Sequence, residues 1–230
     1  MFQENISLKQ FSHYKIGGPA KYFYQAKGLA DLAQAIKTAQ AKNLPIFVLG
    51  GSTNLLINDE GYDGLVLKPD IQFVHQSEIR NLTSNICVQV GAGVLMSDLL
   101  NFCAEKGLSG LEWAGGLPGT VGGAIRGNAG AFGGEIKDSI VEVASLTLTE
   151  PKLILRKKED CQFDYRNSIF KKQPNEIVIG AVLELPSGQS KAIREKTDEK
   201  INYRHQKHPM DYPNIGSIFK NVYWNLVPDE

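Results

Sequence analysis

A helix near the start of the chain is predicted from apolar residues that recur at helical spacing. These residues, at positions i, i+3, i+4 and i+7, are Leu32, Ala35, Ile36 and Ala39. Asn43 and Pro45 follow and supply the stop signal. Residues 16–25 carry two glycines, a proline and an aromatic run, which predicts a turn that enters a strand. Residues 45–49 are predicted to form a short buried strand.

The later part of the chain is predicted to contain more strands, with a helix near each end. A strand over 86–90 is followed by a helix over 98–106, for which Ser97 is the expected N-cap and Gly107 the stop. Runs of β-branched residues, separated by charged or proline-containing turns, predict strands over 140–148, 153–156 and 177–185. A helix rich in Lys and Arg is predicted over 190–208. Such a concentration of basic residues usually indicates a solvent-exposed helix face.

Length, charge and cysteine usage exclude several classes of function. The 230 residues, 42% of them hydrophobic, suffice for one large domain or two modest ones. Because 25 basic residues balance 25 acidic ones, we expect neither nucleic acid nor a membrane surface as a partner. The N-terminus has no signal-peptide pattern, and no run reaches the roughly 18 apolar residues of a spanning helix, so we expect a cytoplasmic protein. Cys87, Cys103 and Cys161 lack metal-site spacing and are expected to be buried without disulfides, so no metal is expected.

The most unusual stretch is residues 115–134, in which nine of twenty residues are glycine. A flexible linker would pair glycine with serine and charge, whereas here glycine alternates with apolar residues such as Leu117, Val121 and Ile125. Such doublets permit positive φ and leave N–H groups open to an anion. We therefore favour a cofactor diphosphate site over tight turns alone.

Two other glycine segments are weaker signals. Residues 50–59, GGSTNLLIND, place glycines and hydroxyls at a strand end, which suits either phosphate binding or an ordinary turn, and both interpretations stay open. Gly91 and Gly93 resemble the start of a dinucleotide-binding fingerprint, but Met96 stands where the third glycine is required. No Gly-Lys-Ser/Thr sequence ends the 115–134 stretch, so a P-loop is also rejected. An aromatic residue beside an arginine, as in Tyr165 and Arg166, is on pattern alone more often a stacked surface pair.

Five motifs together resemble one family, the UDP-N-acetylenolpyruvylglucosamine reductases. They are YKIGGPA, LGGSTNLLIND, LEWAGGLPGTVGGAIRGNAGAFGGEIKD, FDYRNSIF and KHPMDYPNIGSIFKN, and they occur in the family's order over nearly the whole chain. The resemblance implies an α+β FAD-binding fold of the vanillyl-alcohol oxidase and p-cresol methylhydroxylase type, with two subdomains at about 1–69 and 70–186. Residues 187–230 would then begin an incomplete α/β substrate-binding domain. The form without the extra tyrosine-bearing loop is the closer match.

The resemblance also implies a reaction and its residues. NADPH would reduce noncovalently bound FAD, which would pass hydride to C3 of the enolpyruvyl ether of a UDP-sugar in peptidoglycan precursor synthesis, with a monomer as the expected state. Arg166 matches the arginine that contacts the enolpyruvyl carboxylate and stabilises its growing charge, and Ser217 matches the proton donor to C2. Tyr165, Lys207 and Asn221 match substrate-binding positions. The implied cofactor-binding residues are Gly50, Gly51, Ser52, Thr53, Asn54, Leu55, Gly115, Gly116, Pro118, Gly119, Thr120, Gly122, Gly123, Ala124, Asn128 and Gly130.

The sequence departs from the family's pattern in three ways. Ser52 replaces a glycine of the more usual GGGSN sequence, and Val222 follows Asn221 where proline is common. The sequence ends at Glu230, so the family's later catalytic glutamate has no counterpart, and Glu112 or Glu135 would have to substitute for it. The alternatives to a reductase are therefore a flavin-binding module without catalysis and an oxidase of the same flavin fold, although FDYR and GSIFKN favour the reductase.

Overall fold

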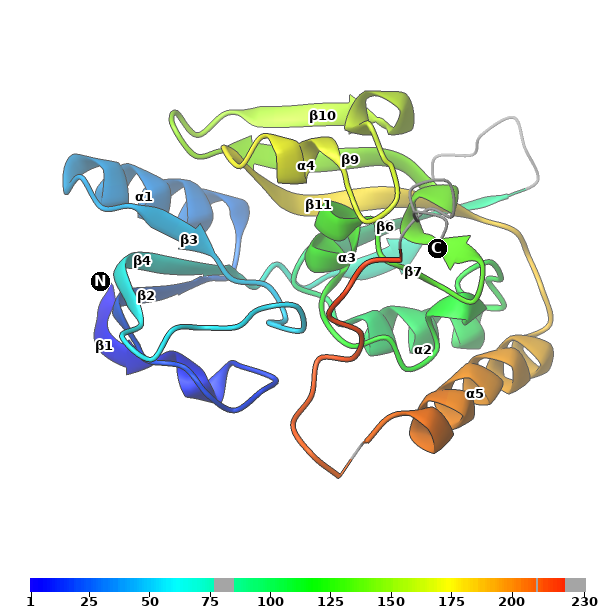
Figure 1. Ribbon diagram of the computed structural model, residues 1–230. Coiled ribbons are helices and arrows are strands. Elements are labelled where there is room, and N and C mark those ends of the chain that lie inside the picture. The colour runs from blue at the N-terminus through cyan, green and yellow to red at the C-terminus, as the bar shows by residue number, and fades with distance from the viewer. Residues whose placement is uncertain (77–84, 210, 222–230) are drawn as a thin grey trace, which may run out of the picture.

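The computed structural model describes residues 1–76, 85–209 and 211–221. Its first sheet has four strands in the order β1-β2-β4-β3, and its second has five in the order β10-β9-β11-β6-β5. Figure 1 shows the first sheet and α1 on one side of the molecule and the second sheet with α2, α3 and α5 on the other. The fold is a mixed α/β arrangement in which the chain finishes the first sheet before it begins the second.

The first sheet combines one antiparallel and two parallel pairings. Its strands are β1 (Gln3–Ser7), β2 (Pro19–Ala26), β3 (Ile46–Val48) and β4 (Tyr62–Pro69), and α1 (Leu29–Ala41) connects β2 to β3. β1 pairs antiparallel with β2, whereas β2 and β3 both pair parallel with β4. The predictions for α1 and β2 are confirmed, and β3 is a strand as predicted, although its residues are half-buried instead of buried. β1 and the central strand β4 were not predicted.

The second sheet is antiparallel throughout. Its strands are β5 (Val74–Gln76), β6 (Ile86–Gly91), β9 (Ile140–Thr147), β10 (Leu153–Lys157) and β11 (Glu176–Leu185), and a small hairpin adds β7 (Gly130–Ala131) and β8 (Gly134–Glu135). The strands predicted for β6, β9, β10 and β11 are confirmed. The antiparallel pairing of β6 with β11 also confirms that Gly91 and Gly93 do not open a parallel dinucleotide-binding unit.

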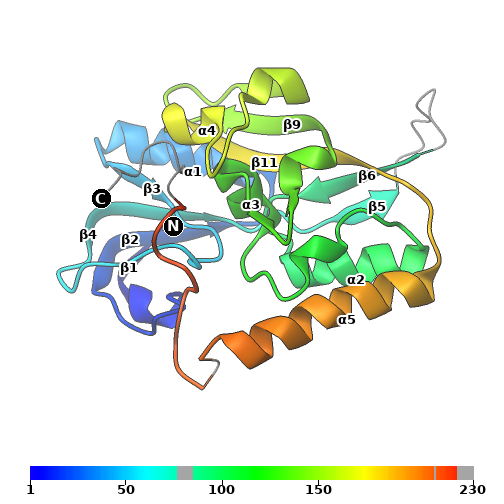
Figure 2. The same cartoon turned by 45° about the vertical axis from the view of Figure 1, so that its right-hand side comes forward.

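Three helices of the second half, α2, α3 and α4, pack against one face of this sheet, and α5 packs on α2. They are α2 (Met96–Lys106), α3 (Val121–Gly127), α4 (Ile169–Lys172) and α5 (Ser190–Lys207), and short 3₁₀ turns cover Leu8–Gln10, Glu112–Ala114, Ile136–Asp138 and Lys158–Cys161. The predictions of α2 and α5 are confirmed, and Figure 2 shows α5 lying along α2. Gly107 ends α2 in the left-handed conformation, as predicted, but Leu95 is its N-cap. The expectation for Ser97 was therefore wrong, because the helix begins at Met96, a buried core residue.

Two hydrophobic clusters hold these layers together. One combines the inner face of the second sheet with α2, α3 and α4, and includes the wholly buried Met96, Leu99 and Ile125. The other packs α1 against β4 and also against Ile177 and Ile179 of β11, so α1 joins the two sheets. All three cysteines are buried, as predicted, and burial raises the pKa of Cys103 to about 12. Among the described residues, no helix is both long and apolar enough to cross a membrane.

Candidate functional site

Two glycine-containing loops from different halves of the chain meet in the structure. A β-carbon added to Gly51 would lie 2.6 Å from Cα of Gly119, so only glycine permits this approach. Gly119 has a φ of 106°, and a β-carbon there would lie 2.9 Å from Oγ1 of Thr53. The loop after β3 and the loop before α3 are therefore interlocked, although more than sixty residues separate them in sequence.

The first of these loops presents backbone donors that the protein itself does not use. The amide of Leu49 donates to the carbonyl of Leu67 at 2.9 Å. Within the described residues, none of the amides over 50–55 donates to a protein acceptor. Ser52 has a φ of 55°, and successive N–H groups with such a left-handed residue form a concave site for an anion. Because main-chain donors are normally paired, this run is suited to a phosphate ligand.

Ser52 has an unusual environment within that loop. Its side chain is 4% exposed, and its hydroxyl has no hydrogen-bond partner in the described structure. The backbone conformation is the one that glycine adopts readily and serine adopts at a cost. Ser52 was expected to have less backbone freedom than glycine. The structure shows that its position requires a conformation that glycine adopts more readily.

In the 115–130 stretch, the amides at the start of α3 have acceptors within the protein, unlike those of the first loop. At the start of α3, the amides of Val121 and Gly122 donate to the carbonyls of Val94 and Ala92, each at 2.9 Å. The amide of Gly123 donates to Oγ1 of Thr120, the N-cap, at 3.4 Å. These N–H groups are occupied within the protein, so the predicted open N–H groups are not found at the start of α3. The carbonyls that occupy the first two come from the loop after β6.

The other predicted cofactor residues fall into three environments. Gly115 and Gly116 lie against α5, where added β-carbons would approach the Thr197 carbonyl at 2.4 Å and Cδ of Arg204 at 2.8 Å. Asn128 is fully buried, and its amide group bonds to the Asp164 carbonyl at 2.9 Å and to the Lys137 amide at 3.3 Å. Asn54 and Pro118 are exposed, Leu55 and Gly50 are half-buried, and Ala124 and Gly130 are buried. Asn128 thus ties the glycine stretch to the loop that carries Arg166.

The predicted catalytic arginine sits beside this stretch. Nη2 of Arg166 donates to the carbonyl of Gly130 at 2.7 Å, and the guanidinium lies over the ring of Tyr165 at 5.4 Å. The hydroxyl of Tyr165 accepts a hydrogen bond from the amide of Asn221 at 3.2 Å. One predicted catalytic residue, two predicted substrate residues and one predicted cofactor residue therefore converge, although they come from three separate motifs.

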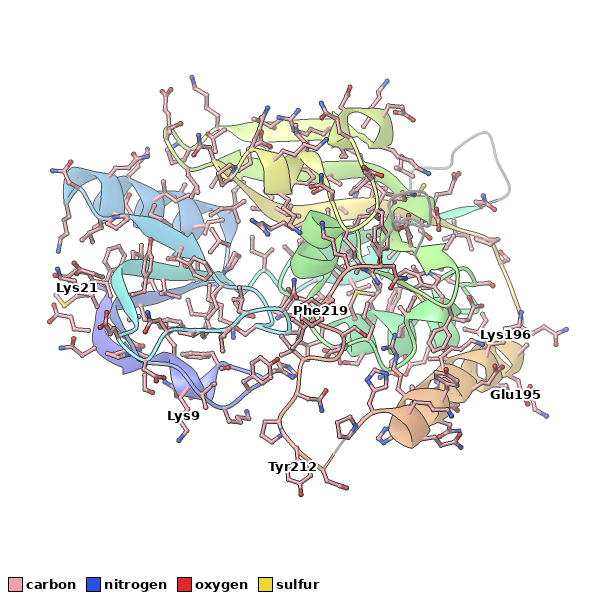
Figure 3. All side chains as sticks on the ribbon, in the orientation of Figure 1. Lys9, Lys21, Glu195, Lys196, Tyr212 and Phe219 are labelled. Atoms are coloured by element: carbon pink, nitrogen blue, oxygen red, sulfur yellow. The ribbon has the colours of Figure 1, made fainter. Side chains whose placement is uncertain are left out.

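The segment after α5 brings the last motif to this place. Figure 1 shows the segment running from the end of α5 back toward α3 and β7. In Figure 3 Phe219 lies where the two halves of the molecule meet, whereas Tyr212 points away from it. Ser217 and Lys207 are exposed, and neither side chain makes a hydrogen bond or ion pair within the described part of the chain. Val222, the other expected departure, lies outside the described residues.

Glu112 and Glu135, the two acids that the sequence analysis considered for a catalytic role, are both engaged in local structure. Glu112 accepts from the hydroxyl of Ser109 at 2.7 Å and from the amide of Gly110 at 2.8 Å. Burial opposes these contacts, but the net effect is a lowered pKa for Glu112. Glu135 pairs with Lys137 and takes part in a capping box with Asp138. Both carboxylates therefore already have partners within the protein.

Sequence reasoning missed two basic residues of this site. Nζ of Lys171 donates to the carbonyl of Arg166 at 3.1 Å. Nε of Arg204 donates to the carbonyl of Gly115 at 2.9 Å, its guanidinium lies over the ring of Phe132, and burial lowers its pKa. The basic character of 190–208 suggested only a solvated face, and nothing in the spacing distinguishes Arg204 from its neighbours. Lys171 directly follows the FDYRNSIF motif, and this position was the one feature of the sequence that could have indicated its place in the site.

The donors over 50–55 and the glycine contacts fit a diphosphate-containing cofactor, and comparison with known proteins agrees. The FAD binding domain family matches residues 20–150. A UDP-N-acetylenolpyruvoylglucosamine reductase from Lactobacillus delbrueckii subsp. bulgaricus is 38% identical over 225 residues, covering 98% of this chain and 73% of that protein. The chain belongs to this reductase family.

Solved structures of the family and of other flavoproteins support the same fold. The crystal structure of UDP-N-acetylenolpyruvylglucosamine reductase from Thermus caldophilus superposes with a TM-score of 0.77 at 29% identity, covering 96% of this chain and 76% of that one. A vanillyl-alcohol-oxidase-type flavoprotein from Myceliophthora thermophila reaches 0.55 at 17% identity, over 74% of this chain and 32% of the other. The second match concerns the fold alone. The expected FAD-binding fold of the vanillyl-alcohol oxidase type is thus confirmed, and this reductase-family chain is shorter than its relatives.

Proposed function

We propose that this chain carries out, or forms the larger part of an enzyme that carries out, the NADPH-dependent, FAD-mediated reduction of UDP-N-acetylglucosamine enolpyruvate to UDP-N-acetylmuramate. The observation that carries the proposal is the meeting of Tyr165, Arg166 and Asn221 beside Gly130, in the same glycine stretch whose Gly119 contacts the loop with unused amide donors. An anion-binding loop and a group of cationic residues, both in contact with one glycine stretch, suit a flavin cofactor and an acidic substrate. Action in the cytoplasm as a monomer, and a preference for NADPH over NADH, are parts of the same proposal.

FAD would be held noncovalently by the amides over 50–55 and, when bound, would supply the hydride chemistry of the reaction. The interlocked Gly51 and Gly119 bring those amides next to the loop that precedes α3. Pro69 ends the first sheet and Val74 begins the second, so we also propose that the two FAD-binding subdomains meet between these residues.

Arg166 is proposed to bind the enolpyruvyl carboxylate through its planar guanidinium. The carboxylate gains negative charge after hydride reaches C3, and a positioned cation stabilises that charge most where water is excluded. The carbonyl of Gly130 and the ring of Tyr165 fix the guanidinium before the substrate arrives. Preorganisation of this kind avoids the cost of reorienting the side chain during the reaction.

Ser217 is proposed to donate its hydroxyl proton to C2. A serine hydroxyl is a weak acid, but an enolate carbon is basic enough to take its proton when the hydroxyl lies close by. The exposed position of Ser217 in the segment after α5 leaves it accessible to a substrate that lies against Tyr165 and Asn221. Lys207 would contact the diphosphate of the nucleotide.

The experiment that tests this proposal separates the two half-reactions by stopped-flow spectroscopy of the FAD-loaded protein. The first records flavin reduction by NADPH, and the second records reoxidation by the enolpyruvyl substrate without oxygen. We expect Ser217→Ala to leave the first nearly unchanged and to slow the second about 100-fold or more, because the proton is needed only after hydride transfer. Arg166→Ala should slow the second and also weaken substrate binding.

Three results would contradict the proposal. A purified, folded protein without releasable flavin would remove the cofactor assignment. Reduction by NADPH without any reoxidation by substrate would identify a flavin-binding module without catalysis. Rapid oxygen consumption with sugar lactones or alcohols would identify an oxidase instead.

A further inference from the structure

Arg166 is held in a backbone conformation that an arginine adopts at a cost. Its φ is 54°, in the left-handed region. A residue in this region persists only when its surroundings impose the conformation, and such residues concentrate at functional sites. Arg166 lies in a tight turn, in which Asp164 and Asn167 exchange backbone hydrogen bonds at 3.0 and 3.1 Å. The conformation of this turn decides where the guanidinium points.

Lys171 reaches back to this turn from α4. Its ammonium donates to the carbonyl of Arg166 at 3.1 Å, so it contacts the strained residue at its backbone. The side chain of Arg166 is fixed separately, by the carbonyl of Gly130. The arginine is therefore supported at two points, and only the backbone contact comes from a charged group.

The surroundings of Lys171 are rich in positive charge. Burial, then the charge of Lys220, then that of Arg126 lower the pKa of Lys171. Arg126 is the last-turn cation of α3, and its carbonyl accepts from the hydroxyl of Ser168 at 2.7 Å, which links α3 to α4. Lys220 precedes Asn221, which contacts Tyr165. Together with Arg166, these cations come from α3, the turn, α4 and the last segment.

No carboxylate neutralises these cations in the part of the chain that the structure describes. None of Arg126, Arg166, Lys171 and Lys220 takes part in an ion pair there. Asp164, in the same turn, accepts from the amide of Tyr165 at 2.7 Å and acts electrostatically on Lys137. Placing like charges together without a counterion is unfavourable, so the arrangement is suited to an anionic ligand.

We propose that Lys171 is a positioning residue for Arg166: its ammonium holds the left-handed turn that aims the guanidinium, and with Arg126 and Lys220 it keeps the pocket positive toward the carboxylate of the substrate. This inference rests on the proposed function, because it takes Arg166 as the carboxylate contact. It adds a residue that acts through the backbone of Arg166. Removing the ammonium leaves the Arg166 carbonyl without its donor, and the turn can relax away from the left-handed conformation.

The test compares two nucleotides that differ in the group that Arg166 binds. UDP-N-acetylmuramate carries a carboxylate and UDP-N-acetylglucosamine does not, and each is titrated into the FAD-loaded protein by calorimetry. We expect Lys171→Met to weaken binding of the muramate about tenfold, the loss expected for one hydrogen bond to a charged group, and binding of the glucosamine less than about twofold. Lys171→Arg, which keeps charge and donors, should recover most of the loss.

Lys172 provides the matched control, because it is the neighbouring residue of α4, is exposed, and its side chain makes no hydrogen bond or ion pair in the described structure. Lys172→Met should change neither affinity. Lys171→Gln serves as the second variant if Lys171→Met does not fold, and the same difference between nucleotides is expected. An equal loss for both nucleotides, or no loss for either, would overturn the inference while the proposed function stands. A FAD-loaded wild type that binds neither nucleotide would overturn the proposed function, and the inference with it.

Discussion

The two glycine-rich segments of this chain, residues 50–55 and 115–130, look alike in composition, but the start of α3 in the second uses backbone amides of the kind that the first leaves unused. In the first, the amides have no acceptor within the described residues. In the second, the amides of Val121, Gly122 and Gly123 are occupied by carbonyls of the loop after β6 and by the N-cap Thr120. The first segment offers donors to a ligand, and in the second the start of α3 does not, although the amides of Gly119 and Thr120 just before α3 also have no acceptor within the described residues. Glycine content alone does not distinguish these roles. They are distinguished by which backbone amides have acceptors within the protein.

The largest effect is expected where the two segments touch. Gly51→Ala would place a methyl group 2.6 Å from Cα of Gly119, and both backbones would have to move apart. Overpacking of this kind costs about 1–3 kcal/mol, so FAD affinity should fall about 10- to 100-fold. Fluorescence titration of the cofactor-free protein with FAD measures this loss. Unchanged FAD affinity in a folded Gly51→Ala protein would mean that the contact between the loops does not matter for the cofactor.

A stabilising effect is expected at the neighbouring residue. Ser52→Gly removes a serine from the left-handed region and also removes a buried hydroxyl without a partner. Each feature costs on the order of 1–3 kcal/mol, and the added flexibility of glycine in the unfolded chain offsets part of the gain. We expect a net increase of about 1–2 kcal/mol in the free energy of unfolding, measured by urea denaturation. A decrease would show that the hydroxyl has a partner, such as an internal water, that stabilises it.

The smallest effect is expected at a glycine that neither segment needs. A β-carbon at Gly127, the last residue of α3, would have no neighbour within 4 Å, and its φ is not positive. Gly127→Ala should raise stability by about 0.5–1 kcal/mol through helix propensity and leave FAD affinity unchanged. It is therefore the control for Gly51→Ala. A clear loss of FAD binding in this variant would extend the ligand site to the end of α3.

Sequence patterns predicted the elements that are defined by local residue spacing and missed those that depend on tertiary contacts. Periodicity predicted α1 correctly because Leu32 and Ile36 face the core, and the β-branched runs predicted β9, β10 and β11 of the second sheet, whereas β5 was not predicted. Periodicity missed α3, since glycine is a poor helix former and this helix depends on carbonyls at Ala92 and Val94 that only the tertiary structure supplies. It also missed β4, although residues 64–67 are a short apolar run that is consistent with a buried central strand.

In the candidate site, too, some features could be predicted from the sequence and others could not. The resemblance to a family was enough to group Tyr165, Arg166 and Asn221 in one site, because the motifs that contain them carry that information. It did not indicate which amides are unused, since that depends on acceptors elsewhere in the fold. The contact of Lys171 with Arg166 was also hidden, because it depends on the turn that the folded chain makes at Arg166.

Amide hydrogen exchange with and without FAD tests the central claim most directly. The amides over 50–55 lack acceptors within the described residues, so they should exchange rapidly in the cofactor-free protein and become protected when FAD binds. The amides of Val121 and Gly122 already have acceptors and should be slow in both states. Protection that appears at the start of α3 while residues 50–55 exchange at an unchanged rate would contradict this account and return the diphosphate to the 115–130 stretch.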